Sequence, residues 1–182
     1  PIRVQSMTTT NTMDTEATIA QSLRMAASGS EYIRITAPSI NEAKNLAEIR
    51  KGLHAKGCRV PLIADIHFTP NAAEVAARIV EKVRVNPGNI KQFDDKVGEI
   101  ARAAKDMGTP IRIGVNAGSL EKDLLEKYGE PCPEALVESA LDHIKLLQDH
   151  DFHEYKVAVK ASDIFLAVAA YQQLADAVDC PL

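Results

Sequence analysis

Residues 111–116 read Ile-Arg-Ile-Gly-Val-Asn, an aliphatic run with a polar residue or glycine at every second position, and a glycine turn follows. Residues two apart on a β-strand share a face, so Arg112 and Asn116 are predicted to point to the same side. Four other stretches also place polar residues at alternate positions near their carboxyl ends: Ile33-Arg34-Ile35-Thr36, Ala64-Asp65-Ile66-His67, Val83-Arg84-Val85-Asn86 and Val157-Ala158-Val159-Lys160. Together the five stretches predict a shared pocket, rich in Arg, Lys and His, for an anionic small molecule.

Helical patterns fill most of the gaps between these strands. Strands are predicted to begin near residues 2, 31, 60, 81, 110 and 154. Helices are predicted over residues 14–28, 40–56 and 94–107, from Thr69-Pro70, from Pro133 and after a cap at Ser162. We expect the last helix to bury a stripe formed by Ile164, Val168, Tyr171 and Leu174.

This alternation predicts an α/β fold with parallel strands that are buried on both faces. A doubly wound sheet would gather its ligand at one switch point, whereas a (β/α)8 barrel gathers it from most strand ends. Polar residues end five of the six predicted strands, which favours a barrel of the TIM type. A full barrel needs roughly 250 residues. We therefore expect a partial barrel of about six βα units, with a seventh strand beginning near Pro181.

The composition argues against several classes of function. The net charge is −4, so nucleic-acid binding, which usually needs a broad excess of Lys and Arg, is not expected. No apolar run approaches the roughly 20 residues of a membrane span, and no signal peptide is recognisable. The three cysteines, Cys58, Cys132 and Cys180, lack the spacing of a zinc site or a disulfide framework, so no metal site is expected in these residues.

Four cations, Arg34, Arg84, Arg112 and Lys160, lie on four predicted strands and would repel one another in one cavity unless an anion of charge about −2 joined them. A diphosphate meets that need. The alternative is that they pair with local carboxylates or pack inside a barrel, and Asp65 could neutralise one of them.

His67 follows Asp65 by two residues, so both are predicted to face the pocket, where His67 could bind a phosphate oxygen or donate a proton. A structural role is the alternative. Asn86 and Asn116 each precede a glycine turn and could bond a ligand or merely close the turn. The other histidines, His54, His143, His150 and His153, are expected to be solvated.

Five ordered segments carry a family resemblance. They are Val4-Gln5-Ser6-Met7-Thr8, Ala64-Asp65-Ile66-His67-Phe68, Arg84-Val85-Asn86-Pro87-Gly88-Asn89, residues 112–123 and Val159-Lys160-Ala161-Ser162-Asp163. The chain resembles the 4-hydroxy-3-methylbut-2-enyl diphosphate synthases, oxidoreductases of the methylerythritol phosphate route to isoprenoids, from Gln5 to Leu182.

The resemblance implies a barrel related to that of dihydropteroate synthase. In the resembled family this barrel binds 2-C-methyl-D-erythritol 2,4-cyclodiphosphate. The family opens this ring reductively with two electrons from a small protein such as flavodoxin or ferredoxin. In the family a [4Fe–4S] cluster is held by three cysteines and a glutamate of a separate C-terminal domain, within a homodimer. Residues 1–182 would then be the substrate-binding barrel part, without the iron–sulfur domain, and inactive alone.

By the same resemblance, the substrate-binding residues are Arg34, His67, Arg84, Asn86, Arg112, Asn116 and Lys160, with Asp65 and Ser162 in support. No catalytic residue is assigned. The expected location is the cytoplasm, or the plastid stroma in a plant. Two alternatives stay open: a pterin-condensing transferase of the dihydropteroate synthase type, and a non-catalytic diphosphate-binding module.

Overall fold

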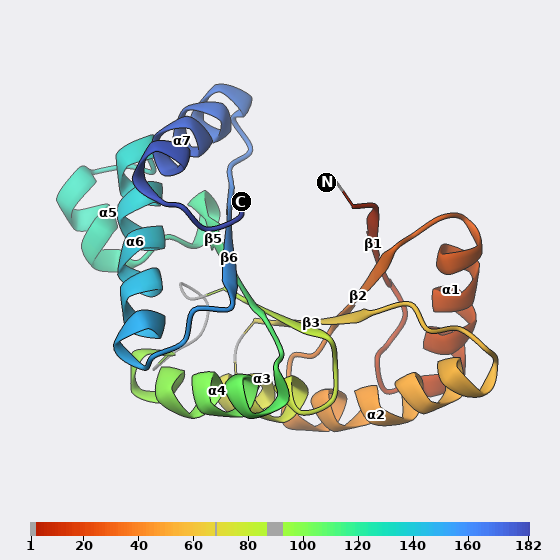
Figure 1. Cartoon of the computed structure of the whole chain (residues 1–182). Coiled ribbons are helices and arrows are strands. Elements are labelled where there is room, and N and C mark those ends of the chain that lie inside the picture. Colours follow the sequence, from red (N-terminus) through yellow and green to blue (C-terminus); the bar gives the residue numbers. More distant parts are fainter. Residues whose placement is uncertain (1–2, 68, 87–92) are drawn as a thin grey trace.

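The chain forms a curved, six-stranded parallel sheet with helices on its outer side (Figure 1). The computed structural model describes residues 3–67, 69–86 and 93–182. The strands follow one another in sequence order from edge to edge: β1 (Gln5–Met7), β2 (Tyr32–Thr36), β3 (Leu62–Ile66), β4 (Lys82–Val85), β5 (Ile111–Asn116) and β6 (Tyr155–Lys160). Figure 1 shows the sheet bent so that β1 and β6 face each other across an open concave side. This half-barrel confirms the predicted fold class.

Most helices begin within a residue or two of the predicted starts. They are α1 (Thr15–Ala27), α2 (Ile40–Ala55), α3 (Pro70–Ala77), α4 (Phe93–Met107), α5 (Lys122–Tyr128), α6 (Pro133–Asp149) and α7 (Ile164–Ala177). The Asp14 side chain accepts the Ala17 N–H at the start of α1, and Ser39 accepts from Asn41 at the start of α2. Pro70 and Pro133 occupy first-turn positions, where a missing N–H costs no helical bond.

The two faces of the sheet differ in polarity. The expectation that the strands are buried on both faces holds for all five residues of β3, but the concave side is not apolar. Ile33, Ile35, Val83 and Val85 are completely buried and belong to the hydrophobic core. The alternate positions carry the polar and charged side chains of the concave side, and β2 therefore alternates between buried and half-buried residues. The core lies between sheet and helices, which leaves the concave side for polar groups.

Two features of α7 correct the sequence predictions. Asp163, not Ser162, is the N-cap, because its carboxylate accepts the Leu166 N–H at 2.9 Å while Ser162 is one residue too early. The expected apolar stripe is also wrong in part. Ile164 is 75% exposed and Val168 is 51% exposed, whereas Ala170 and Leu174 are fully buried. Val168 lies about half a turn around the helix from Ala170.

A short helix, α5, was not predicted, although Leu124, Leu125 and Tyr128 have helical spacing and Gly129 ends it with a φ of 80°. It follows a 3-10 turn, η2 (Ala117–Ser119), directly after β5.

The expected seventh strand is indicated by one hydrogen bond. The Val157 N–H of β6 donates to the Pro181 carbonyl at 3.1 Å. The same contact starts β3 and β5, where Ile33 donates to Pro61 and Val83 to Pro110. The backbone at Pro181 thus lies beside β6 as the residues before β3 and β5 lie beside their neighbours.

Candidate functional site

The strand register brings the predicted site residues together on the concave side. Asp65 of β3 is opposite Arg84 of β4, Arg84 is opposite Arg112 of β5, and Arg112 is opposite Lys156 of β6. Nearer the carboxyl ends, Asn116 is opposite Lys160. Neighbouring strands lie about 4.8 Å apart, so these side chains form one continuous row.

Asp65 is the centre of this row. Its side chain is completely buried and forms ion pairs with two arginines: Arg34 Nη2 lies 2.6 Å from Oδ2, and Arg84 Nη1 lies 3.0 Å from Oδ1. His67 Nε2 lies 3.0 Å from Oδ2. An ionised carboxylate can only accept, so Nε2 is the donor in this contact. The alternative that the cations pair with local carboxylates therefore holds for Arg34 and Arg84, and Asp65 contacts both of them rather than one.

These contacts keep Asp65 ionised. Burial by itself would raise the pKa of the carboxyl group, but the hydrogen bond from His67 and the charges of Arg34 and Arg84 outweigh burial. The pKa falls from 3.8 to about 2. A negative charge therefore holds Arg34 and Arg84 in place at every physiological pH.

The positive charge of Arg34, Arg84 and Arg112 is greater than the single negative charge of Asp65 can neutralise. Burial lowers the pKa of Arg84, and the positive charges of Arg34 and Arg112 lower it further. Burial and the charge of Arg34 also lower the pKa of Arg112. Arginine remains charged despite such shifts. The Nε atoms of Arg34 and Arg112 are buried and have no hydrogen-bond partner within the described part of the chain. A site with spare charge and spare donors suits an oxyanion.

Asn86 and Asn116 lie at the carboxyl ends of β4 and β5 and make different contacts. Asn86 is buried, and its Nδ2 donates to Ser119 Oγ at 3.2 Å. Asn116 Oδ1 accepts the Gly118 N–H at 3.2 Å and so caps η2. The turn-closing interpretation therefore holds for Asn116. The expected glycine turn at Pro87-Gly88-Asn89 lies outside the described residues. Ser119 was not predicted as a site residue, although it is part of the glycine turn after β5.

Sequence reasoning also missed two lysines on the same face. Lys82 precedes Arg84 by two residues, and Lys156 precedes Lys160 by four, so the alternation could have revealed both. With Arg112 they border a cavity of about 380 Å³ toward the amino ends of the strands, also lined by Arg3, Gln5, Tyr32, Tyr171 and Leu182. Lys82 Nζ lies 4.7 Å from the Tyr32 ring centroid. Burial and the positive charge of Lys156 and Arg112 lower the pKa of Lys82.

Lys160 and Ser162 stand apart from the Asp65 cluster. Both are exposed, and Lys160 ends β6 opposite Asn116. Lys160 therefore lies at the carboxyl-end rim of the concave side.

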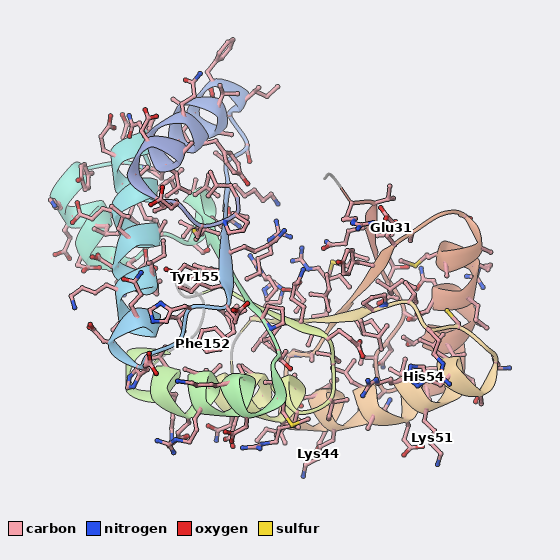
Figure 2. All side chains as sticks on the ribbon, in the orientation of Figure 1. Glu31, Lys44, Lys51, His54, Phe152 and Tyr155 are labelled. Atoms are coloured by element: carbon pink, nitrogen blue, oxygen red, sulfur yellow. The ribbon has the colours of Figure 1, made fainter. Side chains whose placement is uncertain are left out.

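The remaining histidines lie outside this row. His54 is at the end of α2 in the outer helical layer (Figure 2), and its Nδ1 lies 3.0 Å from Arg59 Nη1. The expectation that His143 is solvated is wrong: it is 6% exposed, and its Nδ1 lies 2.6 Å from the Ser139 carbonyl oxygen. Its Nε2 lies 3.7 Å from Glu121, the N-cap of the unpredicted helix α5, and α5 packs against α6.

Side chains that could bind a metal ion are scattered rather than grouped in the described residues. Cys58, Cys132 and Cys180 are unpaired and half-buried. Within residues 3–67, 69–86 and 93–182, no three His, Cys, Asp or Glu side chains are grouped so that they could hold a metal ion. In the same residues, every helix is too short or too polar to cross a membrane.

Comparison with known proteins now places the chain. The sequence profile of the GcpE TIM-barrel domain matches residues 1–182. The chain belongs to this family. The GcpE assignment agrees with the half-barrel and with the resemblance noted in the sequence.

Similar proteins include curated members named 4-hydroxy-3-methylbut-2-en-1-yl diphosphate synthase (flavodoxin). The one from Zymomonas mobilis is 59% identical over 183 aligned positions, covering 100% of this chain and 47% of the relative. That from Gluconacetobacter diazotrophicus is 56% identical, covering 100% of this chain and 46% of the relative. This GcpE-family chain thus spans about half the length of the curated relatives it matches.

Two solved structures support the fold. Dihydropteroate synthase from Xanthomonas albilineans has a TM-score of 0.60 at 16% identity, covering 96% of this chain and 66% of that one. A truncated 3-deoxy-D-arabino-heptulosonate 7-phosphate synthase from Thermotoga maritima has a TM-score of 0.56 at 9% identity, covering 95% and 60%. At these identities the likeness establishes the fold of the GcpE domain alone.

Proposed function

We propose that this chain is the substrate-binding barrel part of a 4-hydroxy-3-methylbut-2-en-1-yl diphosphate synthase. The ligand would be 2-C-methyl-D-erythritol 2,4-cyclodiphosphate. The observation that carries the proposal is the pair Arg34 and Arg84, fixed by the buried Asp65 beside Arg112. The names of relatives at 54–59% identity support the same reaction. The pterin-condensing alternative rests on a fold likeness alone and is not favoured.

The chemistry of the row fits a diphosphate. Guanidinium groups bind phosphate oxygens through paired N–H donors, and the three arginines carry more positive charge than Asp65 balances. Lys160 at the rim would add a mobile charge to the second phosphate. Because Asp65 already orients Arg34 and Arg84, little rotamer entropy is lost when the ligand binds. The same cations would stabilise negative charge that develops on the departing ring oxygen.

His67, Asn86 and Asn116 take supporting parts in this proposal. His67 holds a proton on Nε2 toward Asp65, which fixes the orientation of its ring beside the ligand. The Asn86–Ser119 bond joins the end of β4 to the turn after β5, and the bond from the Gly118 N–H fixes Asn116 in the same turn. We assign the proton-transfer step to no residue.

The family's electron transfer is proposed to take place outside residues 1–182. Its [4Fe–4S] cluster would supply the two electrons, and the printed names of the relatives indicate flavodoxin as donor. The described residues offer no ligand set for such a cluster. We propose that a C-terminal iron–sulfur domain carries the cluster and meets the barrel of a second subunit in a homodimer.

The test is binding of the cyclic diphosphate to the protein at its full natural length, measured by titration calorimetry. Arg112→Ala should weaken binding about tenfold or more, because charge-assisted hydrogen bonds are lost. Arg102→Ala is the matched control, since Arg102 is exposed on α4. It should leave the affinity unchanged. Equal affinities of wild type and Arg112→Ala would contradict the pocket.

A further inference from the structure

Gly114 occupies the middle of β5 on the concave side, between Arg112 and Asn116 and opposite Ala158. A Cβ atom built on Gly114 would lie 2.5 Å from Arg84 Nε, 2.8 Å from Nη2 and 3.0 Å from Cζ. Carbon atoms in proteins do not approach other heavy atoms so closely without displacement. The guanidinium group of Arg84 therefore fills the space that a side chain at position 114 would need.

Arg84 has little freedom to move away. Its Nη1 donates to Asp65 Oδ1 at 3.0 Å, and its Nη2 donates to the Gly114 carbonyl at 3.2 Å. Its side chain is only 11% exposed. A methyl group at position 114 would have to break one or both of these hydrogen bonds.

Other glycines do not have this relation to the site. A Cβ on Gly118 would meet only Asn116 Oδ1, at an ordinary 3.7 Å. A Cβ on Gly52 of α2 would lie 2.3 Å from Ile19 Cδ1, the flexible tip of a core side chain on the outer side of the sheet. Gly114 is, among the glycines that the structure describes, the one whose Cβ would strike an arginine of the concave row.

We propose that Gly114 is a positioning residue: its missing side chain lets the Arg84 guanidinium lie across β5, bonded to Asp65 and to the Gly114 carbonyl. In this position Arg84 presents its remaining N–H groups to the concave side. The part of the proposal that concerns the placement of Arg84 depends only on contacts within the protein. Its consequence for ligand binding rests on the proposed function, because it assumes that a diphosphate binds there.

The first measurement concerns placement and needs no ligand. In crystal structures of the ligand-free protein at full natural length, Gly114→Ala should separate Arg84 Nη1 from Asp65 Oδ1 beyond hydrogen-bonding distance. Gly52→Ala is the matched control, because it also adds a methyl group at a crowded position but away from the row. It should leave that pair intact. An unmoved Arg84 in Gly114→Ala would overturn the proposal.

The second measurement is a double-mutant cycle on inorganic pyrophosphate affinity. Gly114→Ala should weaken binding about tenfold, and Gly52→Ala should not. In an Arg84→Ala background, adding Gly114→Ala should cause no further loss, because the clashing group is gone. Additive losses would overturn the role of Gly114. A failure of the proposed function gives a different result from a failure of the Gly114 proposal. Arg84 would move in the Gly114→Ala crystal structure, yet neither Arg84→Ala nor Arg112→Ala would change the pyrophosphate affinity.

If Gly114→Ala does not fold, the stabilities of the Arg84→Ala variants with and without Gly114→Ala decide the question instead of their affinities. The clash then predicts that Gly114→Ala combined with Arg84→Ala folds as well as Arg84→Ala alone, measured by urea unfolding. A double variant that also fails to fold would show that the cost at position 114 does not come from Arg84, and would overturn the proposal.

Discussion

Asp65 carries one negative charge but contacts two arginines and a histidine. A buried carboxylate with three donors is held ionised, and in return it fixes the donors. Removing it would leave Arg84 buried without a counter-charge, which is far more costly than losing a surface ion pair. The residue therefore connects stability with ligand binding.

This connection predicts a pH dependence. The folded-state pKa of Asp65 lies below 3.8, so its stabilising contribution is fully present above pH 3.8 and is lost as the pH falls through about 2. Asp65→Asn should lower the free energy of unfolding by about 3 kcal/mol at neutral pH. The difference from wild type should shrink between pH 4 and pH 2, by about 2 kcal/mol. Urea unfolding at several pH values measures it.

The control for this series is Asp142→Asn, because Asp142 is exposed on α6. It should change stability little at any pH. A difference between wild type and Asp65→Asn that stays constant down to pH 2 would contradict the assignment of the low pKa to Asp65.

At the scale of the single element, α7 depends on Asp163 rather than on its neighbour. Asp163→Ala should lower the free energy of unfolding by about 1 kcal/mol, because the Leu166 N–H loses its acceptor. Ser162→Ala, one residue earlier and exposed, should change it by no more than a few tenths. Thermal and urea unfolding of the two variants compare them directly. A larger effect of Ser162→Ala would restore the sequence-based assignment.

The sequence predicts best those elements that have a clear repeat of apolar and polar residues or a clear start signal. Arg112 and Asn116 within an aliphatic run define β5, and Thr69-Pro70 marks the start of α3 although Thr69 makes no capping hydrogen bond. The short helix α5 offers only two turns of pattern and was missed. The error on His143 has the same origin, because His143 lies 3.7 Å from Glu121, the N-cap of α5, and α5 packs against α6.

The site was predictable in outline only. Alternation places Arg34, Arg84 and Arg112 on one face, and the structure confirms that they share the concave side. The contacts of Asp65 depend on register and side-chain length. On β2 the residue opposite Asp65 is Thr36, not Arg34. Arg34 contacts the carboxylate because its side chain is long enough to reach it from two residues away. Neither the register nor the space over Gly114 can be read from spacing along the chain.

For the whole molecule, the described sheet ends in β1 on one side and in β6, with Pro181 beside it, on the other. Unpaired strand edges and exposed apolar groups such as Phe165, which is 86% exposed, favour association. We expect the 182-residue chain, produced by itself, to self-associate. Light scattering should give a mass well above 19.8 kDa. A stable monomer over a hundredfold concentration range would contradict this.

The concentration of cations on one side of a chain with a net charge of −4 affects how fast ligands arrive. Lys82, Lys156 and Lys160 stand with three arginines on the concave side, so the excess of carboxylates is distributed over the rest of the surface. A small anion is steered toward the mouth, whereas a long polyanion meets the acidic exterior as well. The protein can thus favour small anions kinetically, at the moment of encounter. Added salt would weaken that preference, because exposed charges farther apart than the Debye length, about 8 Å at physiological ionic strength, are largely screened.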